Sequence, residues 1–163
     1  MLSSRARPLA GELVIEPVFQ PIVDLLAGEP IGCELLSRVR GGLTAPTDLF
    51  KDARACGELW EFERNCRRAA FECIARLEPA ERPALCFVNV SPDVFEDERF
   101  EDGLLARELA EFGLLPTSVV VEITETHGIT DHARFEHVMT SHQHQGFRFA
   151  VDDFGSGHSS LIT

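Results

Sequence analysis

Apolar residues in the first quarter of the chain follow strand spacing. Residues 14–23 and 31–36 are predicted strands, and the short turn around Gly28 that joins them predicts an antiparallel hairpin. Pro17 and Pro21 cannot both take part in a central ladder, because proline has no backbone donor. The first strand is therefore expected at an edge of its sheet.

Helical and strand spacing then alternate along the rest of the chain. A short helix, which Thr47 or Asp48 can cap, is expected to end near Gly57. Further helices are predicted over residues 58–77, 101–112 and 131–145, the last one capped by Thr130, and strands over 84–90, 118–124 and 147–151. A hairpin followed by repeated helix and strand units predicts an α/β fold with a parallel sheet covered by helices.

Composition narrows the range of partners. A length of 163 residues with 44% hydrophobic residues suggests one domain with a core. The net charge of −12 repels nucleic acids and anionic membranes, so an anionic substrate would need metal ions or local arginines. The chain shows no apolar run of about 18 residues that could span a membrane and no signal peptide, so a cytoplasmic location is expected.

Cysteines and histidines give no metal-binding pattern. No two of the five cysteines have CxxC spacing, so they are expected to be small buried hydrophobes in a reducing cytosol; they are Cys33, Cys56, Cys66, Cys73 and Cys86. Four histidines recur every five residues, which scatters them around a helix, and they are interpreted as solvated; they are His127, His132, His137 and His142.

Oxygen-bearing side chains fall near the ends of successive predicted strands. Glu34 lies near the end of the second strand, Asn89 at the end of the third and Glu122 late in the fourth, and Asp152 and Asp153 follow the fifth. Taken singly, each has an ordinary interpretation as a turn former, a solvent-facing residue or part of a loop. Together they predict a site at the carboxyl ends of the strands, and adjacent carboxylates favour a neutralising cation. Oxygen ligands suit Mg²⁺ or Mn²⁺ rather than zinc.

Arg38 follows Glu34 by four residues. A guanidinium beside a metal site is suited to holding a phosphate, although an ordinary surface arginine is an equal alternative from its position alone.

Five motifs occur in order along the chain: FQPIVD at residues 19–24, ELLSR at 34–38, VNVSP at 88–92, VEITET at 121–126 and VDDFGSGHSSL at 151–161. Together they resemble the motifs of EAL domains, which are bacterial cyclic-di-GMP phosphodiesterases. The resemblance divides the chain into an N-terminal tail, residues 1–13, and a truncated EAL domain, residues 14–163.

The resemblance implies a partial TIM-type (β/α) barrel whose first strand is antiparallel and which does not close within the chain. It implies hydrolysis of cyclic-di-GMP to linear pGpG in second-messenger signalling, with two Mg²⁺ or Mn²⁺ ions. Its implied site residues are Glu34, Asn89, Glu122 and Asp152 for the first metal, Asp152 and Asp153 for the second, Gln20, Leu36 and Arg38 for the substrate, and Glu125 for steadying the loop after Asp153.

The sequence departs from the family pattern in three places. Leu35 replaces the alanine of the name motif, and His158 stands where tyrosine is common. The family's catalytic lysine and general-base glutamate would lie beyond Thr163, so no catalytic base is expected within the chain and the second metal site is expected to be incomplete.

A complete barrel of this type needs about 250 residues. Three explanations fit the shorter chain: a fragment of a longer protein or an incomplete gene product, which we favour, a homodimer that covers the open barrel edge, and a rearranged open sheet. The expected function is a phosphodiesterase that is inactive or weak as this chain. The alternatives are a degenerate cyclic-di-GMP receptor and a protein-interaction module, the latter using a helix face at Leu104, Leu105, Leu109 and Phe112 that is more often ordinary core.

Overall fold

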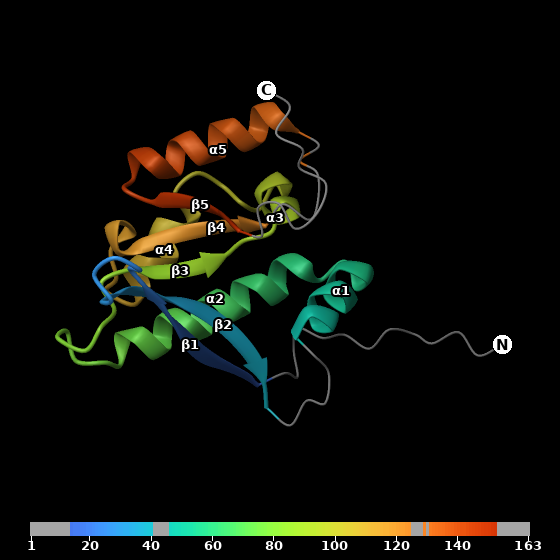
Figure 1. Ribbon diagram of the computed structural model, residues 1–163. Helices are drawn as coiled ribbons and strands as arrows, with labels where there is room; N and C mark the ends of the chain where they lie inside the picture. Colours follow the sequence, from blue (N-terminus) through green and yellow to red (C-terminus); the bar gives the residue numbers. More distant parts are fainter. Residues whose placement is uncertain (1–13, 41–45, 125–128, 130, 153–163) are drawn as a thin grey trace.

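The computed structural model describes residues 14–40, 46–124, 129 and 131–152, without the side chains of residues 46, 47, 124 and 152. These residues form one sheet of five strands in the order β1-β2-β3-β4-β5 (Figure 1). The strands are β1 (Ile15–Val23), β2 (Pro30–Val39), β3 (Cys86–Asn89), β4 (Val119–Thr124) and β5 (Arg148–Asp152). The helices are α1 (Pro46–Cys56), α2 (Leu59–Ala75), α3 (Pro92–Glu96), α4 (Leu104–Glu111) and α5 (His132–His144), with a 3-10 turn, η1 (Pro116–Ser118).

The predicted hairpin is confirmed. β1 pairs antiparallel with β2 and is an edge strand, as its prolines required. In the turn, the Asp24 carboxylate accepts hydrogen bonds from the backbone amides of Leu26 at 2.7 Å and Ala27 at 3.0 Å, and these bonds lower the pKa of Asp24. Gly28 ends the turn at a φ of 69°, in the left-handed region that glycine tolerates.

The other strand pairs are parallel, so the α/β prediction is confirmed. Within the described residues β1 and β5 lie at opposite edges and do not pair, so the sheet stays open, as expected of a partial barrel. None of the described helices is long and apolar enough to cross a membrane.

The helices bury one face of the sheet. Leu35, Val88 and Val121, from three neighbouring strands, belong to one apolar cluster with residues of α2, α4 and α5. Leu105 and Leu109 of α4 are among the most buried side chains, so the core interpretation of that helix face is confirmed. Val120 is also buried but lies outside this cluster, because alternate residues of a strand point to opposite faces.

Several element boundaries differ from the prediction. α1 begins at Pro46, so Thr47 and Asp48 lie inside its first turn instead of capping it. Asp131, rather than Thr130, caps α5, and its carboxylate accepts from the Arg134 amide at 3.0 Å. The helix α3 was not predicted, because five residues are too few to show a helical period.

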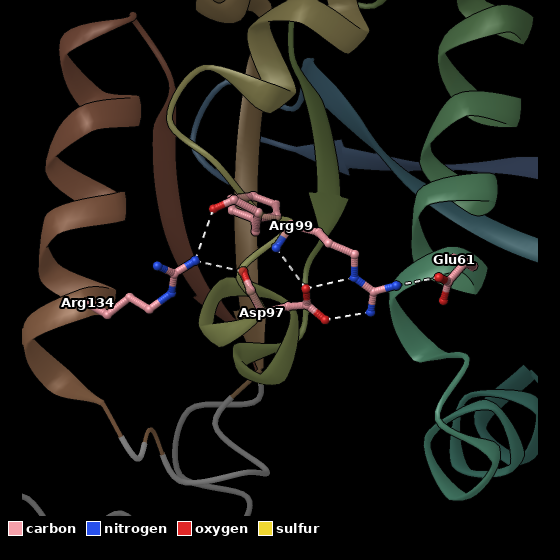
Figure 2. Close-up of polar contacts among 5 residues, drawn as sticks. Glu61, Asp97, Arg99 and Arg134 are labelled. Atoms are coloured by element: carbon pink, nitrogen blue, oxygen red, sulfur yellow. Dashed lines mark hydrogen bonds and ion pairs between the residues drawn. The ribbon is translucent and has the colours of Figure 1, made fainter.

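A polar network joins α2 to the segment after α3 and to α5 (Figure 2). Arg99 donates to both carboxylate oxygens of Asp97, at 2.8 and 2.6 Å, and also pairs with Glu61 of α2. Arg134 of α5 donates to the Asp97 carbonyl at 2.7 Å. The Cζ atom of Arg99 also lies 4.6 Å from the centroid of the Trp60 ring, in a cation–π contact. One guanidinium therefore contacts Asp97, Glu61 and Trp60.

The interpretation of the histidines as solvated is wrong for His142. Its ring is fully buried, stacks on Phe100 with centroids 5.3 Å apart, and Nδ1 lies 2.8 Å from the Val138 carbonyl. His132 and His137 are exposed, as expected, and His127 lies outside the described residues. The signal for burial was present: Val138 and His142 are four residues apart, on one face of the helix.

The cysteines are all free. Cys33, Cys66 and Cys86 are buried, as predicted, whereas Cys56 and Cys73 are only half-buried.

Candidate metal and substrate site

The β1–β2 register places four of the predicted site residues on one face of the sheet. Gln20 lies directly opposite Glu34, and residues opposite each other in an antiparallel pair share a face. Leu36 and Arg38 follow Glu34 at intervals of two, so they lie on the same face. Gln20 and Arg38 are exposed and Leu36 is half-buried.

The parallel pairs extend this face across the sheet. Glu34 pairs with Phe87, so Asn89, two residues further, shares the face of Glu34. Asn89 in turn pairs with Glu122. The partner of Thr124 is Asp152, which therefore occupies a register position of the same face, although its side chain lies outside the description.

The described helices pack against the opposite face of the sheet and leave this one uncovered. The residues between the site positions, such as Leu35 and Val88, belong to the helix-covered core. Alternation along each strand therefore separates the apolar contacts from the candidate site, and the same period that builds the core places the predicted oxygen ligands on one face.

Glu34 and Asn89 are in direct contact. The Asn89 side-chain amide donates from Nδ2 to Oε1 of Glu34 at 2.9 Å, and both residues are half-buried. Because the amide nitrogen is used on Glu34, the other end of the amide, Oδ1, is the end that can hold a cation. Glu122 is half-buried and its Oε2 atom is buried.

The donor set fits a hard divalent cation, since it consists of carboxylate and amide oxygens. Within the described side chains no group of three or more His, Cys, Asp or Glu residues converges on one point. Asp153, Glu125 and the side chain of Asp152 lie outside the described residues, so among the expected carboxylate ligands this finding covers only Glu34 and Glu122.

Two placements differ from the prediction. Glu34 lies near the middle of β2 rather than near its end, because pairing with β1 extends β2 to Val39, beyond its last pair with β3 at Leu35. Asp152 is the last residue of β5 rather than the first residue after it.

Glu63 of α2, which is 3% exposed, is not among the residues that the sequence motifs predict for the site. Its carboxylate accepts from the backbone amide of Ser91 at 3.2 Å and from the Ser91 hydroxyl, just after β3. Burial raises the pKa of Glu63, and the contacts with Ser91 and Arg67 oppose that rise. A signal existed: Glu63 and Arg67 form an acid–base pair four residues apart, beside the apolar face of α2.

Comparison with known proteins identifies the family. The model of the EAL domain matches residues 7–163. The chain belongs to the EAL domain family. The expected boundary between a tail and the domain at residue 14 stays a prediction.

Two curated relatives show the range of this family. The chain is 31% identical over 159 residues to the probable cyclic di-GMP phosphodiesterase PdeI of Escherichia coli, covering 93% of this chain and 20% of PdeI. It is 26% identical over 144 residues to the blue light- and temperature-regulated antirepressor BluF of E. coli, covering 88% of this chain and 35% of BluF. The chain thus spans a minor part of each relative.

Solved EAL structures share the fold. The manganese and cyclic-di-GMP complex of Klebsiella pneumoniae BlrP1 at pH 6 superposes with a TM-score of 0.76 and 28% identity, over 97% of this chain and 39% of BlrP1. The EAL domain of Mycobacterium smegmatis DcpA superposes with a TM-score of 0.68 and 27% identity, over 90% of this chain and 58% of that one. The open five-stranded sheet described above therefore shares the fold of part of an EAL TIM-type barrel.

Proposed function

We propose that this chain provides the cation-binding and substrate-binding side of a cytoplasmic phosphodiesterase that hydrolyses cyclic-di-GMP to linear pGpG. The observation that carries the proposal is the register of the sheet. It aligns Glu34, Asn89 and Glu122 on the face away from the helices, with position 152 next in line. The name of PdeI as a probable cyclic di-GMP phosphodiesterase and the cyclic-di-GMP complex of BlrP1 support the choice of substrate.

The residues on this face divide into two roles. Glu34, Asn89, Glu122 and Asp152 would hold one Mg²⁺ or Mn²⁺ ion, and Asp152 with Asp153 would contribute to a second. Such ions, when bound, polarise a phosphoryl oxygen and lower the pKa of a bound water. The hydrogen bond between Asn89 and Glu34 orients both groups before a cation arrives, which reduces the ordering cost of binding.

Gln20, Leu36 and Arg38 would contact the substrate. Arg38 occupies a register position on the face of Glu34, and its exposed guanidinium donates from Nη1 to the Ser37 carbonyl at 2.9 Å. A guanidinium in that position suits a phosphate oxygen, because its planar donors match two oxygens at once. Glu125 would steady the loop after Asp153.

Turnover by the 163-residue chain should be slow. None of the proposed roles includes a general base that takes the proton of the attacking water. Such a group is typically worth roughly 10²–10⁴-fold in rate. Binding is therefore the sharper test of the site than catalysis.

The test is calorimetric titration of the chain with cyclic-di-GMP, with and without Mg²⁺ or Mn²⁺. The site variants are Glu34→Gln and Glu122→Gln, and the matched control is Glu136→Gln, which removes one exposed carboxylate from α5. We expect metal-dependent binding that both site variants weaken at least tenfold and the control leaves unchanged.

Two outcomes would redirect the proposal. Binding that is equal with and without metal would favour the receptor without catalysis. No binding under any condition would refute the substrate assignment and leave the interaction module as the alternative. Turnover at the rate of complete family members would refute the expectation of a slow chain.

A further inference from the structure

Ser91 is hydrogen-bonded to helix α2, which carries none of the proposed ligands. Glu63 of α2 accepts from both the amide and the hydroxyl of Ser91. Ser91 stands at the N-cap position of α3, yet its hydroxyl makes no capping bond to that helix. The hydroxyl oxygen of an N-cap serine usually accepts a hydrogen bond from a backbone amide in the first turn of its helix. The Ser91 hydroxyl instead donates to Glu63 of α2.

This contact fixes the strand end that carries Asn89. Ser91 follows Asn89 by two residues, and the intervening Val90 is buried and donates its amide to the Glu122 carbonyl at 2.9 Å. On the far side, the Ser91 carbonyl accepts from Val94 at 3.0 Å, at the start of α3. The backbone between β3 and α3 is therefore hydrogen-bonded to β4, α2 and α3. The Asn89 side chain, at the start of this fixed segment, donates to Glu34.

Glu63 itself is anchored in a buried ionic group between α2 and α4. Arg67, 3% exposed, lies 3.8 Å from the Glu63 carboxylate and 3.5 Å from that of Glu108 in α4. Arg64, which is more exposed, pairs with the other oxygen of Glu108 at 2.7 Å. Arg67 forms no hydrogen bond to any described residue, so its buried charge is compensated by ion pairing with these two carboxylates.

Stability alone is a weak reason for this arrangement. Buried ion pairs often stabilise a fold no more than apolar residues of the same volume, because desolvation offsets the attraction. Positional precision is a better reason, since ligands of a cation must be held to about 0.5 Å by the residues behind them.

We propose that Glu63 is a positioning residue, which locks Ser91 and thereby directs the Asn89 side chain toward Glu34 and a divalent cation. The part about the cation rests on the proposed function, whereas the effect on Asn89 does not. Loss of groups that orient a metal ligand typically weakens metal affinity by about 10–100-fold.

The experiment compares four variants with the unmodified chain. Glu63→Ala removes both bonds to Ser91, and Ser91→Ala removes the bond of the hydroxyl only. Glu63→Gln keeps an acceptor for the Ser91 amide, and the Ser91 hydroxyl can accept from its new donor. Glu108→Ala is the matched control, because it also deprives Arg67 of a carboxylate but has no bond to Ser91.

The first readout needs no metal: exchange protection and chemical shift of the Asn89 side-chain amide by NMR. We expect faster exchange in Glu63→Ala, a smaller change in Ser91→Ala, and values close to the unmodified chain in Glu63→Gln and Glu108→Ala. Equal changes in Glu63→Ala and Glu108→Ala, or no change in any variant, would overturn the inference. If Glu63→Ala does not fold, an unchanged Asn89 signal in Ser91→Ala would overturn it.

The second readout is Mn²⁺ affinity, from the fraction of free Mn²⁺ in electron paramagnetic resonance titrations. We expect Glu63→Ala to weaken Mn²⁺ binding about tenfold or more, with affinity restored in Glu63→Gln and retained in Glu108→Ala. An unmodified chain that binds no Mn²⁺ would refute the proposed metal site, and the Asn89 signal would still decide the positioning role.

Discussion

Gly32 provides a direct test of how closely β2 packs against the segment that leads into β3. A Cβ atom placed on Gly32 would lie 2.5 Å from the Leu85 carbonyl oxygen and 2.9 Å from the Leu85 Cβ atom. The Leu85 carbonyl also accepts from the Cys33 amide at 2.9 Å, so its position cannot shift without straining that bond. Gly32→Ala must therefore push β2 away from the segment that leads into β3.

The magnitude follows from three contributions. Overpacking of this kind costs about 1–3 kcal/mol, and a weakened backbone hydrogen bond costs about 1 kcal/mol more. The lower entropy of alanine in the unfolded chain returns roughly 0.4–1 kcal/mol. The net loss of unfolding free energy should be about 2 kcal/mol, which lowers the melting temperature of a domain of this size by roughly 4–8 °C.

Urea unfolding followed by circular dichroism measures the loss, and hydrogen exchange locates it. The Cys33 amide should lose protection in Gly32→Ala. The control is Gly113→Ala, where φ is 66° and nothing lies within 4 Å of the added atom, so only backbone strain is introduced. An unchanged urea midpoint for Gly32→Ala, or a Cys33 amide as protected as in the control, would refute the reasoning.

Three further predictions concern buried groups and assembly. Burial raises the pKa of Cys66 to about 11 and that of Cys86 to about 12, so at pH 8 both thiols should react with N-ethylmaleimide only after unfolding; mass spectrometry showing rapid labelling of the native protein would contradict this. Burial lowers the pKa of His142 despite its bond to Val138 and the nearby Asp102. His142 therefore binds a proton more readily in the unfolded chain than in the folded one. Its contribution to the free energy of unfolding is complete above a pH of about 6.5 and is lost as the pH falls below that value. Urea midpoints at pH 7.5 and 5.5 should differ less in His142→Phe than in the unmodified chain, and equal differences would refute the assignment to His142. A homodimer that covers the open edge at β5 should appear in light scattering as twice the mass of the 18.1 kDa chain, and a stable monomer would exclude it.

The burial of the charged residues of α2 could not be predicted from the sequence. Glu63 and Arg67 were not singled out from the sequence, yet each is only 3% exposed. Periodicity places a residue around a helix axis but does not reveal whether a second helix, here α4 with Glu108, covers that position. His142 was misjudged for the same reason, since Phe100 and Phe147 cover it from other segments.

The sequence by itself determined most of the local elements and named the residues that are expected to be ligands. Apolar runs predicted the strands, Pro17 and Pro21 placed β1 at the edge, and the motif residues Glu34, Asn89 and Glu122 were recognised before any geometry was known. These features depend on neighbours within a few residues, so a linear pattern contains them.

The tertiary structure alone decided which of these residues meet. The bond between Asn89 and Glu34 joins positions 55 residues apart, and that between Ser91 and Glu63 joins positions 28 apart. Each depends on strand register and on helix packing, and a register shift of one residue would turn Asn89 to the helix-covered face. A periodic pattern specifies two faces for every strand, and only packing of the whole sheet against its helices selects the face that becomes the site.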